Sequence, residues 1–222
     1  LDEGSKVLLF NDGSVTGRCA AARRISSEPG VDINDLDLKL MDAIYDTRWT
    51  TMYHAQVYIG LDPEFMVKAH LLIPEGEENI LYFQYMNPEY NEMYKNSQPV
   101  ADETDIYIFS DPQWTHEEHP LGLTYFNTDT NCAALLGMKY FGEHKKGTLT
   151  IAWAIANRNG YASCHGGQKE FKLDNGEKFV ASFFGLSGSG KSTLTHATHN
   201  NKYEEIQVLH DDAFIINTET GA

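Results

Sequence analysis

Short apolar runs separated by turn-forming residues fill most of this 222-residue chain. Between residues 56 and 126 the runs are rich in β-branched and aromatic residues, and turn sequences such as Asp111-Pro112 separate them. Strands are expected at 57–59, 66–73, 80–86, 106–109 and 121–126, and also at 7–10 and 161–165. A short helix packed on the core is expected at 38–44, whereas 148–156 suits either a strand or a helix. The pattern predicts an α/β protein.

A further strand is expected at 179–184, and a glycine-rich loop follows it directly. Gly185, Gly190, Lys191 and Ser192 have the spacing G-x-x-x-x-G-K-[ST], and Gly188 lies inside the loop. Glycine lets backbone N–H groups turn tightly around a polyphosphate. The next helix directs its N-terminus at the anion, Lys191 adds a positive charge, and the Ser192 hydroxyl can ligate Mg²⁺. The complete predicted phosphate loop is Gly185, Leu186, Ser187, Gly188, Ser189, Gly190, Lys191, Ser192 and Thr193.

The last strand, expected at 206–210, runs into Asp211 and Asp212. Two aspartates at a strand end also occur as a helix N-cap. After a phosphate loop, however, a strand that ends in aspartate is the arrangement whose carboxylate meets the Mg²⁺ held by the loop hydroxyl. The metal role is therefore the favoured interpretation.

Charge and composition restrict the partners of the chain. Its 32 acidic and 17 basic residues give a formal net charge of -15, which repels nucleic acid and anionic membranes. No run reaches the roughly 18 apolar residues of a membrane span, and the N-terminus lacks signal-peptide features. Cys19, Cys132 and Cys164 suit reduced thiols better than a disulfide framework. A cytoplasmic protein is expected, and Leu1 in place of a start Met indicates an excised or processed piece.

Several histidines and lysines have a simple structural interpretation. His54, His70, His116 and His119 have no carboxylate at a convincing metal-binding spacing, so they are expected to be structural or surface residues. Two adjacent lysines before Gly147 usually indicate a solvated turn.

Four motifs in a fixed order resemble the ATP-dependent phosphoenolpyruvate carboxykinase family. The loop at 185–194 is similar to that family's GLSGTGKTTL, and residues 142–147 are similar to its GE-x-KKG. A strand ending in His165 stands between them, and His210-Asp-Asp212 takes the place of the family's GDD. Thr16-Gly-Arg18 resembles the family's TGR substrate motif, so the resemblance runs from about residue 16 to about residue 212.

The resemblance implies a gluconeogenic enzyme that converts oxaloacetate and ATP to phosphoenolpyruvate, ADP and CO₂. It implies a mixed α/β N-terminal substrate-binding domain at 1–158, followed at 159–222 by part of a P-loop-containing mononucleotide-binding domain. The implied catalytic residues are Arg18, which grips a substrate carboxylate, Tyr140, which lines the oxaloacetate or CO₂ site, Lys145, Lys146 and Asp211. The implied Mn²⁺ ligands are Lys146, His165 and Asp212, while Lys191 and Ser192 bind the phosphates and Mg²⁺.

The chain departs from the family pattern at three motifs. Residues 19–23 read CAAAR where the family has SPKDK, residues 166–168 read GGQ where it has SAN, and residues 211–216 read DDAFII where it has DDEHGW. The chain also ends before the family's further catalytic arginine and adenine pocket. Two other interpretations stay open: another P-loop phosphotransferase, which needs the loop and Asp211 but not Arg18, Tyr140 or His165, and a non-catalytic nucleotide-binding fragment.

Overall fold

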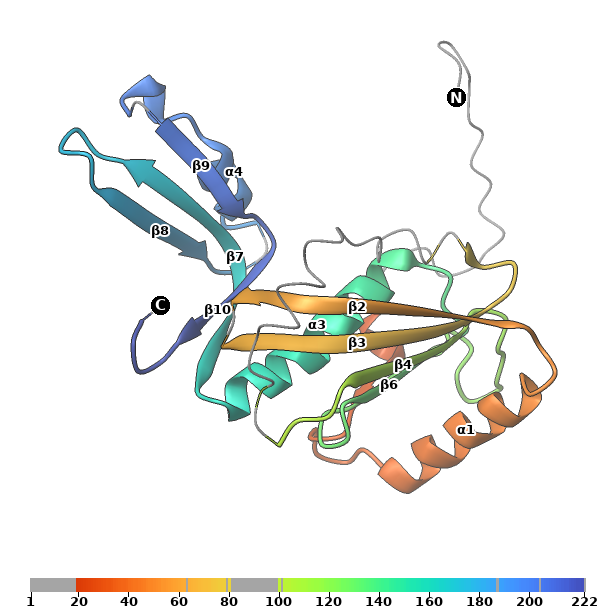
Figure 1. Ribbon diagram of the computed structural model, residues 1–222. Helices are drawn as coiled ribbons and strands as arrows, with labels where there is room; N and C mark the ends of the chain where they lie inside the picture. The colour runs from red at the N-terminus through yellow and green to blue at the C-terminus, as the bar shows by residue number, and fades with distance from the viewer. Residues whose placement is uncertain are drawn as a thin grey trace, which may run out of the picture. The chain divides into compact units, whose positions relative to one another are not determined.

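The computed structural model describes residues 19–62, 64–78, 80, 100, 102–186, 188–203 and 205–221 (Figure 1). The chain forms two compact units, Leu1–Ile155 and Ala156–Ala222. The strand predicted at 7–10 lies outside the described residues. Of the strand predicted at 80–86, only Ile80 is described. No helix in the described part is long and apolar enough to cross a membrane.

A six-stranded mixed sheet forms the centre of the first unit, in the order β1-β5-β6-β4-β3-β2. Its strands are β1 (Arg23–Ile25), β2 (Met52–Asp62), β3 (Phe65–Pro74), β4 (Ile106–Asp111), β5 (Leu123–Asn127) and β6 (Cys132–Leu136). The β2–β3 and β5–β6 pairs are antiparallel, whereas β1–β5, β3–β4 and β4–β6 are parallel. Together with its helices, this sheet confirms the α/β class.

Two helices cover opposite faces of this sheet, α1 (Ile33–Asp46) and α3 (Phe141–Arg158). Tyr125 on β5 belongs to a buried cluster with Leu36 and Ala43 of α1. The next residue, Phe126, meets α3 at Gly147, where an added Cβ would lie 2.9 Å from the ring. Because successive side chains of a strand point to opposite faces, β5 is buried on both sides.

The helix predicted at 38–44 is longer than expected and is partly exposed. The Asp32 side chain accepts a hydrogen bond from the Asp35 N–H at 3.2 Å, so the acidic stretch starts the helix as an N-cap. Leu38 and Met41 point outward, with 67% and 62% of their surface exposed. The packing expected for these two residues is therefore wrong.

Residues 148–156 belong to α3, which decides between the two structures that the sequence left open. The helix begins at Phe141 and so also includes Lys145 and Lys146. The turn expected for these lysines is wrong, because both lie within a continuous helix, but Lys145 is exposed as a solvated residue would be. Gly147 packs against Phe126.

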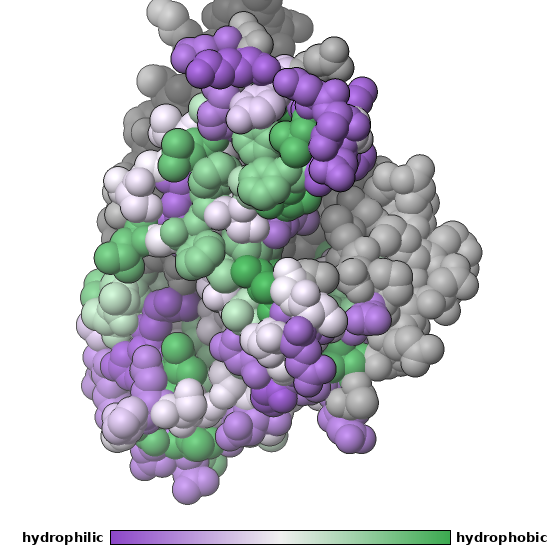
Figure 2. All heavy atoms as spheres, turned by 90° about the vertical axis from the view of Figure 1, so that its left-hand side faces the viewer, coloured by the Kyte–Doolittle hydropathy of each residue, from purple (hydrophilic) through white to green (hydrophobic). Residues whose placement is uncertain are grey.

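The second unit contains an antiparallel sheet of four strands, β7 (Tyr161–Lys172), β8 (Lys178–Phe184), β9 (Glu205–His210) and β10 (Ala213–Asn217). Strand β7 pairs with β8 along one edge, and with β10 and then β9 along the other. The unit also contains the short helix α4 (Lys191–His196). Large apolar side chains such as Phe179, Phe184 and Val208 are exposed in this unit. Figure 2 shows hydrophobic residues gathered on the face of the molecule that it draws.

A buried tyrosine provides a pH-dependent stability term in the first unit. The Tyr125 hydroxyl donates to Asp37 Oδ1 at 3.0 Å and accepts from Asn127 Nδ2 at 3.1 Å. Burial, and then the hydrogen bond to Asp37, raises the pKa of Tyr125 to about 12. Since the folded chain holds this proton more tightly, the stabilisation is complete below pH ~10 and is lost as pH rises towards ~12.

The variant Tyr125→Phe should be less stable than the wild type at pH 8, because it lacks both hydrogen bonds. The advantage of the wild type should shrink by roughly 2–3 kcal/mol between pH ~9 and ~12. Urea unfolding over this pH range measures the effect, and the exposed Tyr45→Phe serves as the control. A wild-type advantage that stays constant with pH would contradict the assignment.

Candidate active site

The predicted phosphate loop joins β8 directly to α4, in the strand–loop–helix context that its motif requires. Gly188 and Gly190 have φ angles of 80° and 86°, a region that L side chains rarely adopt. Lys191 begins α4, and its Nζ donates to the Leu186 carbonyl at 2.8 Å. Its ammonium group therefore lies over the loop, while Ser192 and Thr193 follow it on the exposed start of α4. Ser187 lies outside the described residues.

Two glycines of β7 allow its neighbours to approach closely. A Cβ on Gly167 would lie 2.2 Å from Thr195 Oγ1 on α4, and a Cβ on Gly166 would lie 2.0 Å from the Phe183 carbonyl of β8. Thr195 is buried, and its hydroxyl donates to the Lys191 carbonyl at 2.9 Å. The absence of side chains at Gly166 and Gly167 thus allows α4 and β8 to lie close to β7.

Lys169, two residues further along β7, stabilises the far end of α4. Its buried ammonium donates to the carbonyls of Leu194 and Ala197 at 2.8 and 2.6 Å, and lies 3.2 Å from His199 Nε2. Burial lowers the pKa of this lysine. A cation at this position interacts favourably with the carbonyls at the C-terminal end of the helix.

The paired aspartates lie between β9 and β10, beside the same part of β7. His165 Nε2 is 3.7 Å from Asp212 Oδ1, and the Gly166 N–H donates to the Asp212 carbonyl at 3.1 Å. Asp211 turns instead to α4, where its Oδ2 is 2.9 Å from His196 Nε2. The structure thus brings His165 and Asp212 together. The sequence did not single out His196, because its pairing with Asp211 depends on the fold.

Three of the other predicted catalytic residues, Tyr140, Lys145 and Lys146, lie in the first unit, around the start of α3. The Tyr140 ring packs against Gly142, where a Cβ would lie 2.5 Å from a ring carbon. Lys145 and Lys146 follow in the first turns of the helix. The predicted metal ligands are therefore divided, with Lys146 in the first unit and His165, Ser192 and Asp212 in the second.

An ion pair anchors this helix start to the segment that follows Arg18. Arg23 Nε lies 3.1 Å from Oε1 of Glu143, whose side chain is fully buried. The Arg23 guanidinium also donates to Thr150 Oγ1 at 3.3 Å and lies over the Phe126 ring. Arg18 itself lies outside the described residues, but Arg23 follows it by only five positions.

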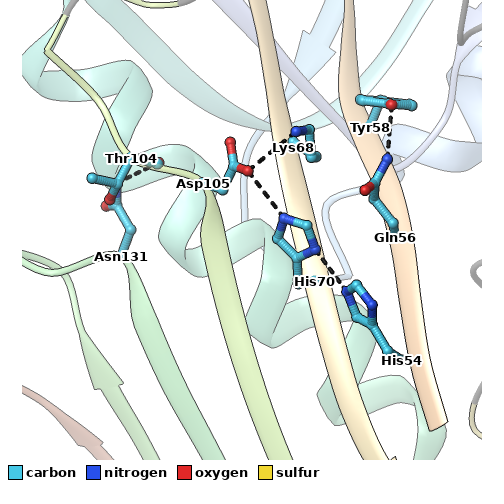
Figure 3. A network of polar contacts seen from close by, with 8 residues as sticks. All are labelled: His54, Gln56, Tyr58, Lys68, His70, Thr104, Asp105 and Asn131. Carbon is cyan, nitrogen blue, oxygen red and sulfur yellow. Dashed lines mark hydrogen bonds and ion pairs between the residues drawn. The ribbon is translucent and has the colours of Figure 1, made fainter.

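A separate polar network crosses β2, β3 and the start of β4 (Figure 3). His54 Nε2 is 2.8 Å from His70 Nδ1, and His70 Nε2 is 3.0 Å from Asp105 Oδ2. Lys68 Nζ lies 3.3 Å from the same carboxylate oxygen. His70 also stacks on Tyr107, so the network links three neighbouring strands.

Comparison with known proteins assigns the chain to a family. The family model for phosphoenolpyruvate carboxykinase matches residues 4–222. The chain belongs to the ATP-dependent phosphoenolpyruvate carboxykinase family. The family resemblance inferred from the motifs is therefore confirmed, and the match extends beyond the segment that those motifs cover.

Members of this carboxykinase family from several eukaryotes align with the chain. The phosphoenolpyruvate carboxykinase (ATP) of Dictyostelium discoideum is 26% identical over 234 residues, which cover 96% of this chain and 40% of that protein. The Kluyveromyces lactis protein of the same name is 26% identical, over 77% of this chain and 31% of its own length. A glycosomal form from Trypanosoma brucei brucei is 35% identical, over 43% of this chain and 19% of its own length. The chain thus spans at most about two fifths of these relatives.

The variant Lys169→Met should loosen α4, because it removes the donor of two carbonyls at the end of the helix. A local loss of roughly 2–4 kcal/mol corresponds to amide exchange at least about tenfold faster in 191–197. Hydrogen exchange followed by mass spectrometry measures this rate. Lys172→Met on the same strand, whose contact with Glu205 is exposed and 3.8 Å long, should leave it unchanged. Equal exchange in the two variants would contradict the role of Lys169.

Proposed function

We propose that this protein is an ATP-dependent phosphoenolpyruvate carboxykinase, which converts oxaloacetate and ATP to phosphoenolpyruvate, ADP and CO₂ in gluconeogenesis. The observation that carries the proposal is the family match over residues 4–222. The names of the relatives from Dictyostelium and Kluyveromyces support the same activity. Because the chain spans only part of their length, we attribute the activity to the full-length protein.

In this proposal the chain contains two domains with different roles. Residues 1–158 form the substrate-binding domain, and residues 159–222 form the start of a P-loop mononucleotide-binding domain. The loop from Gly185 to Thr193 wraps the phosphates of ATP with its backbone N–H groups, and Lys191 supplies a positive charge. The left-handed glycines and the position of Lys191 over the loop support this role.

The donor atoms of the second unit fit a divalent cation. At a separation of 3.7 Å, His165 Nε2 and Asp212 Oδ1 can both lie about 2.2 Å from one ion. We assign Mn²⁺ to Lys146, His165 and Asp212, and Mg²⁺ to the phosphate loop through Ser192, with Asp211 as a supporting carboxylate. A cation held there would act as a Lewis acid beside the developing negative charge.

The organic substrate is assigned to residues of the first domain. Arg18 grips a carboxylate of oxaloacetate, since a guanidinium recognises carboxylates in a bidentate manner. Tyr140 lines the pocket for oxaloacetate and CO₂, and Lys145 helps to hold the substrate. A five-residue segment reaches at most about 18 Å, so the contact of Arg23 with Glu143 is compatible with Arg18 acting near the start of α3.

The reaction has two steps. First, the bond between the substrate's C3 and its adjacent carboxylate breaks, CO₂ leaves, and the electron pair forms an enolate. The enolate oxygen then attacks the γ-phosphorus of ATP, the bond to the bridging oxygen breaks, and ADP leaves. Arg18, Lys145 and Lys191 stabilise negative charge during these steps, which is electrostatic catalysis by a prearranged cationic site.

We also propose that the protein is cytoplasmic and that it binds neither nucleic acid nor membranes. The net charge of -15 supports the absence of these anionic partners. Two trypanosome relatives are named as glycosomal proteins. Imaging of the tagged full-length protein distinguishes a cytoplasmic from an organellar location.

The full-length protein should form phosphoenolpyruvate from oxaloacetate only when ATP and a divalent cation are present. The variant Arg18→Ala should lower kcat/KM for oxaloacetate by roughly 10- to 100-fold, because one charge-assisted contact contributes about 1.5–3 kcal/mol. Its KM for ATP should stay nearly unchanged. Initial rates with each substrate varied in turn measure both effects.

Arg24→Ala is the matched control, since the described hydrogen bonds of Arg24 reach only the backbone carbonyls of Ala21 and Arg23. An Arg18→Ala variant that binds ATP more weakly, but keeps wild-type oxaloacetate kinetics, would favour another P-loop phosphotransferase. Failure of the wild type to form phosphoenolpyruvate would overturn the proposal itself.

A further inference from the structure

Backbone hydrogen bonds fix both ends of the loop that connects β4 and β5. At its start, the N–H groups of Trp114 and Gly137 both donate to the Asp111 carbonyl, at 3.2 and 2.9 Å. At its end, the Gly122 N–H donates to the His119 carbonyl at 2.9 Å. Gly122 has a φ of 82°, and a Cβ there would lie 2.7 Å from the Leu136 carbonyl. The residues between these anchors therefore have a defined geometry.

A tight turn within this loop gathers three potential metal ligands. The His119 N–H donates to the His116 carbonyl at 3.0 Å, which closes the turn His116-Glu-Glu-His119. His116, Glu118 and His119 each present a ligand atom, and these atoms all lie within 4.8 Å of one another. Two imidazoles and one carboxylate thus lie close together on one short turn.

Neighbouring side chains hold both imidazoles in place. The His116 ring stacks on Trp114, with a centroid distance of 5.4 Å and an interplanar angle of 12°. The His119 ring lies 6.1 Å from Trp114 and 5.6 Å from His116. These two histidines and Trp114 line a cavity of about 280 Å³ that leaves room for water. Restricting the rings in advance lowers the entropy lost when a ligand binds.

A buried lysine on α1 orients the carboxylate. Lys39 Nζ lies 3.1 Å from Glu118 Oε2 and 2.5 Å from the Asp35 carboxylate. The Asp35 carboxylate already balances the single positive charge of Lys39. The negative charge of Glu118 can therefore interact with a second cation. A positioned partner of this kind is typical of carboxylates that ligate metals.

We propose that His116, Glu118 and His119 form a binding site for a divalent transition metal of the Zn²⁺, Ni²⁺ and Cu²⁺ class. These borderline ions favour imidazole nitrogen together with carboxylate oxygen, and three protein ligands leave one position for water. Mg²⁺ and Ca²⁺ prefer sites made of oxygen ligands and are poorly matched to this set. None of the three residues belongs to the ligand set proposed above for catalysis.

One existing hydrogen bond limits the affinity of this site. The Glu118 N–H donates to His116 Nδ1 at 3.2 Å. Whichever ring nitrogen of His116 binds the metal, Nδ1 must either bind it or carry the proton, so this hydrogen bond is lost. The Glu118 N–H then donates to water instead. Metal binding is therefore weaker than at a site whose ligands keep their existing hydrogen bonds.

Calorimetric titration of the full-length protein with Zn²⁺, in buffer containing millimolar Mg²⁺ and ATP, tests the proposal. The wild type should bind Zn²⁺ at a site that His116→Gln and His119→Gln each weaken by at least about tenfold. His54→Gln is the matched control, because it removes another exposed imidazole from the same unit and should leave this site intact. Circular dichroism checks that each variant is folded.

Tryptophan fluorescence gives a second readout that locates the ion. Ni²⁺ bound beside His116 should quench Trp114, and Trp114→Phe should abolish the saturable part of the quenching. Zn²⁺ affinity that is unchanged in both His116→Gln and His119→Gln would overturn the site. A loss of affinity in His54→Gln alone would also overturn it, by assigning the metal to the network of Figure 3.

Discussion

The second unit depends on one constraint, the absence of Cβ atoms at Gly166 and Gly167 of β7. Any side chain at Gly167 would overlap Thr195, and any at Gly166 would overlap the backbone of β8. Because both positions are glycine, β7 accepts β8 and α4 at close range while pairing with β9 and β10 on its other edge. His165 precedes these glycines on β7, and the Gly166 N–H donates to the Asp212 carbonyl. Lys169 on the same strand stabilises the end of α4.

In the first unit, strand β5 is buried between two helices. Tyr125 faces α1 and Phe126 faces α3, so β5 sets the distance between the two helical layers. The ion pair between the partly exposed Arg23 and the buried Glu143 joins the start of α3 to the segment after Arg18. This contact constrains the part of the unit to which we assign the organic acid.

Local patterns in the sequence predicted the family, the glycine loop and most described strands, because these depend on neighbouring residues. The extent of β7 was not predictable, since Gly166 and Gly167 resemble a strand end until Thr195 and Phe183 are seen beside them. The pairing of Asp211 with His196 and that of His70 with Asp105 were likewise not predictable, because only the fold brings these residues together. The sequence favours structural or surface roles for His116 and His119, because the turn that brings their ring nitrogens within 4.8 Å of the Glu118 carboxylate is seen only in the fold.

We propose that β7 and the β9–β10 connection form the metal-binding part of a carboxykinase site. Electron paramagnetic resonance of free Mn²⁺, titrated with the full-length protein, measures the binding of the ion. His165→Ala should weaken Mn²⁺ binding at least about tenfold, while His54→Ala should bind Mn²⁺ like the wild type. Equal Mn²⁺ affinity in His165→Ala and the wild type would remove His165 from the site and overturn the proposal.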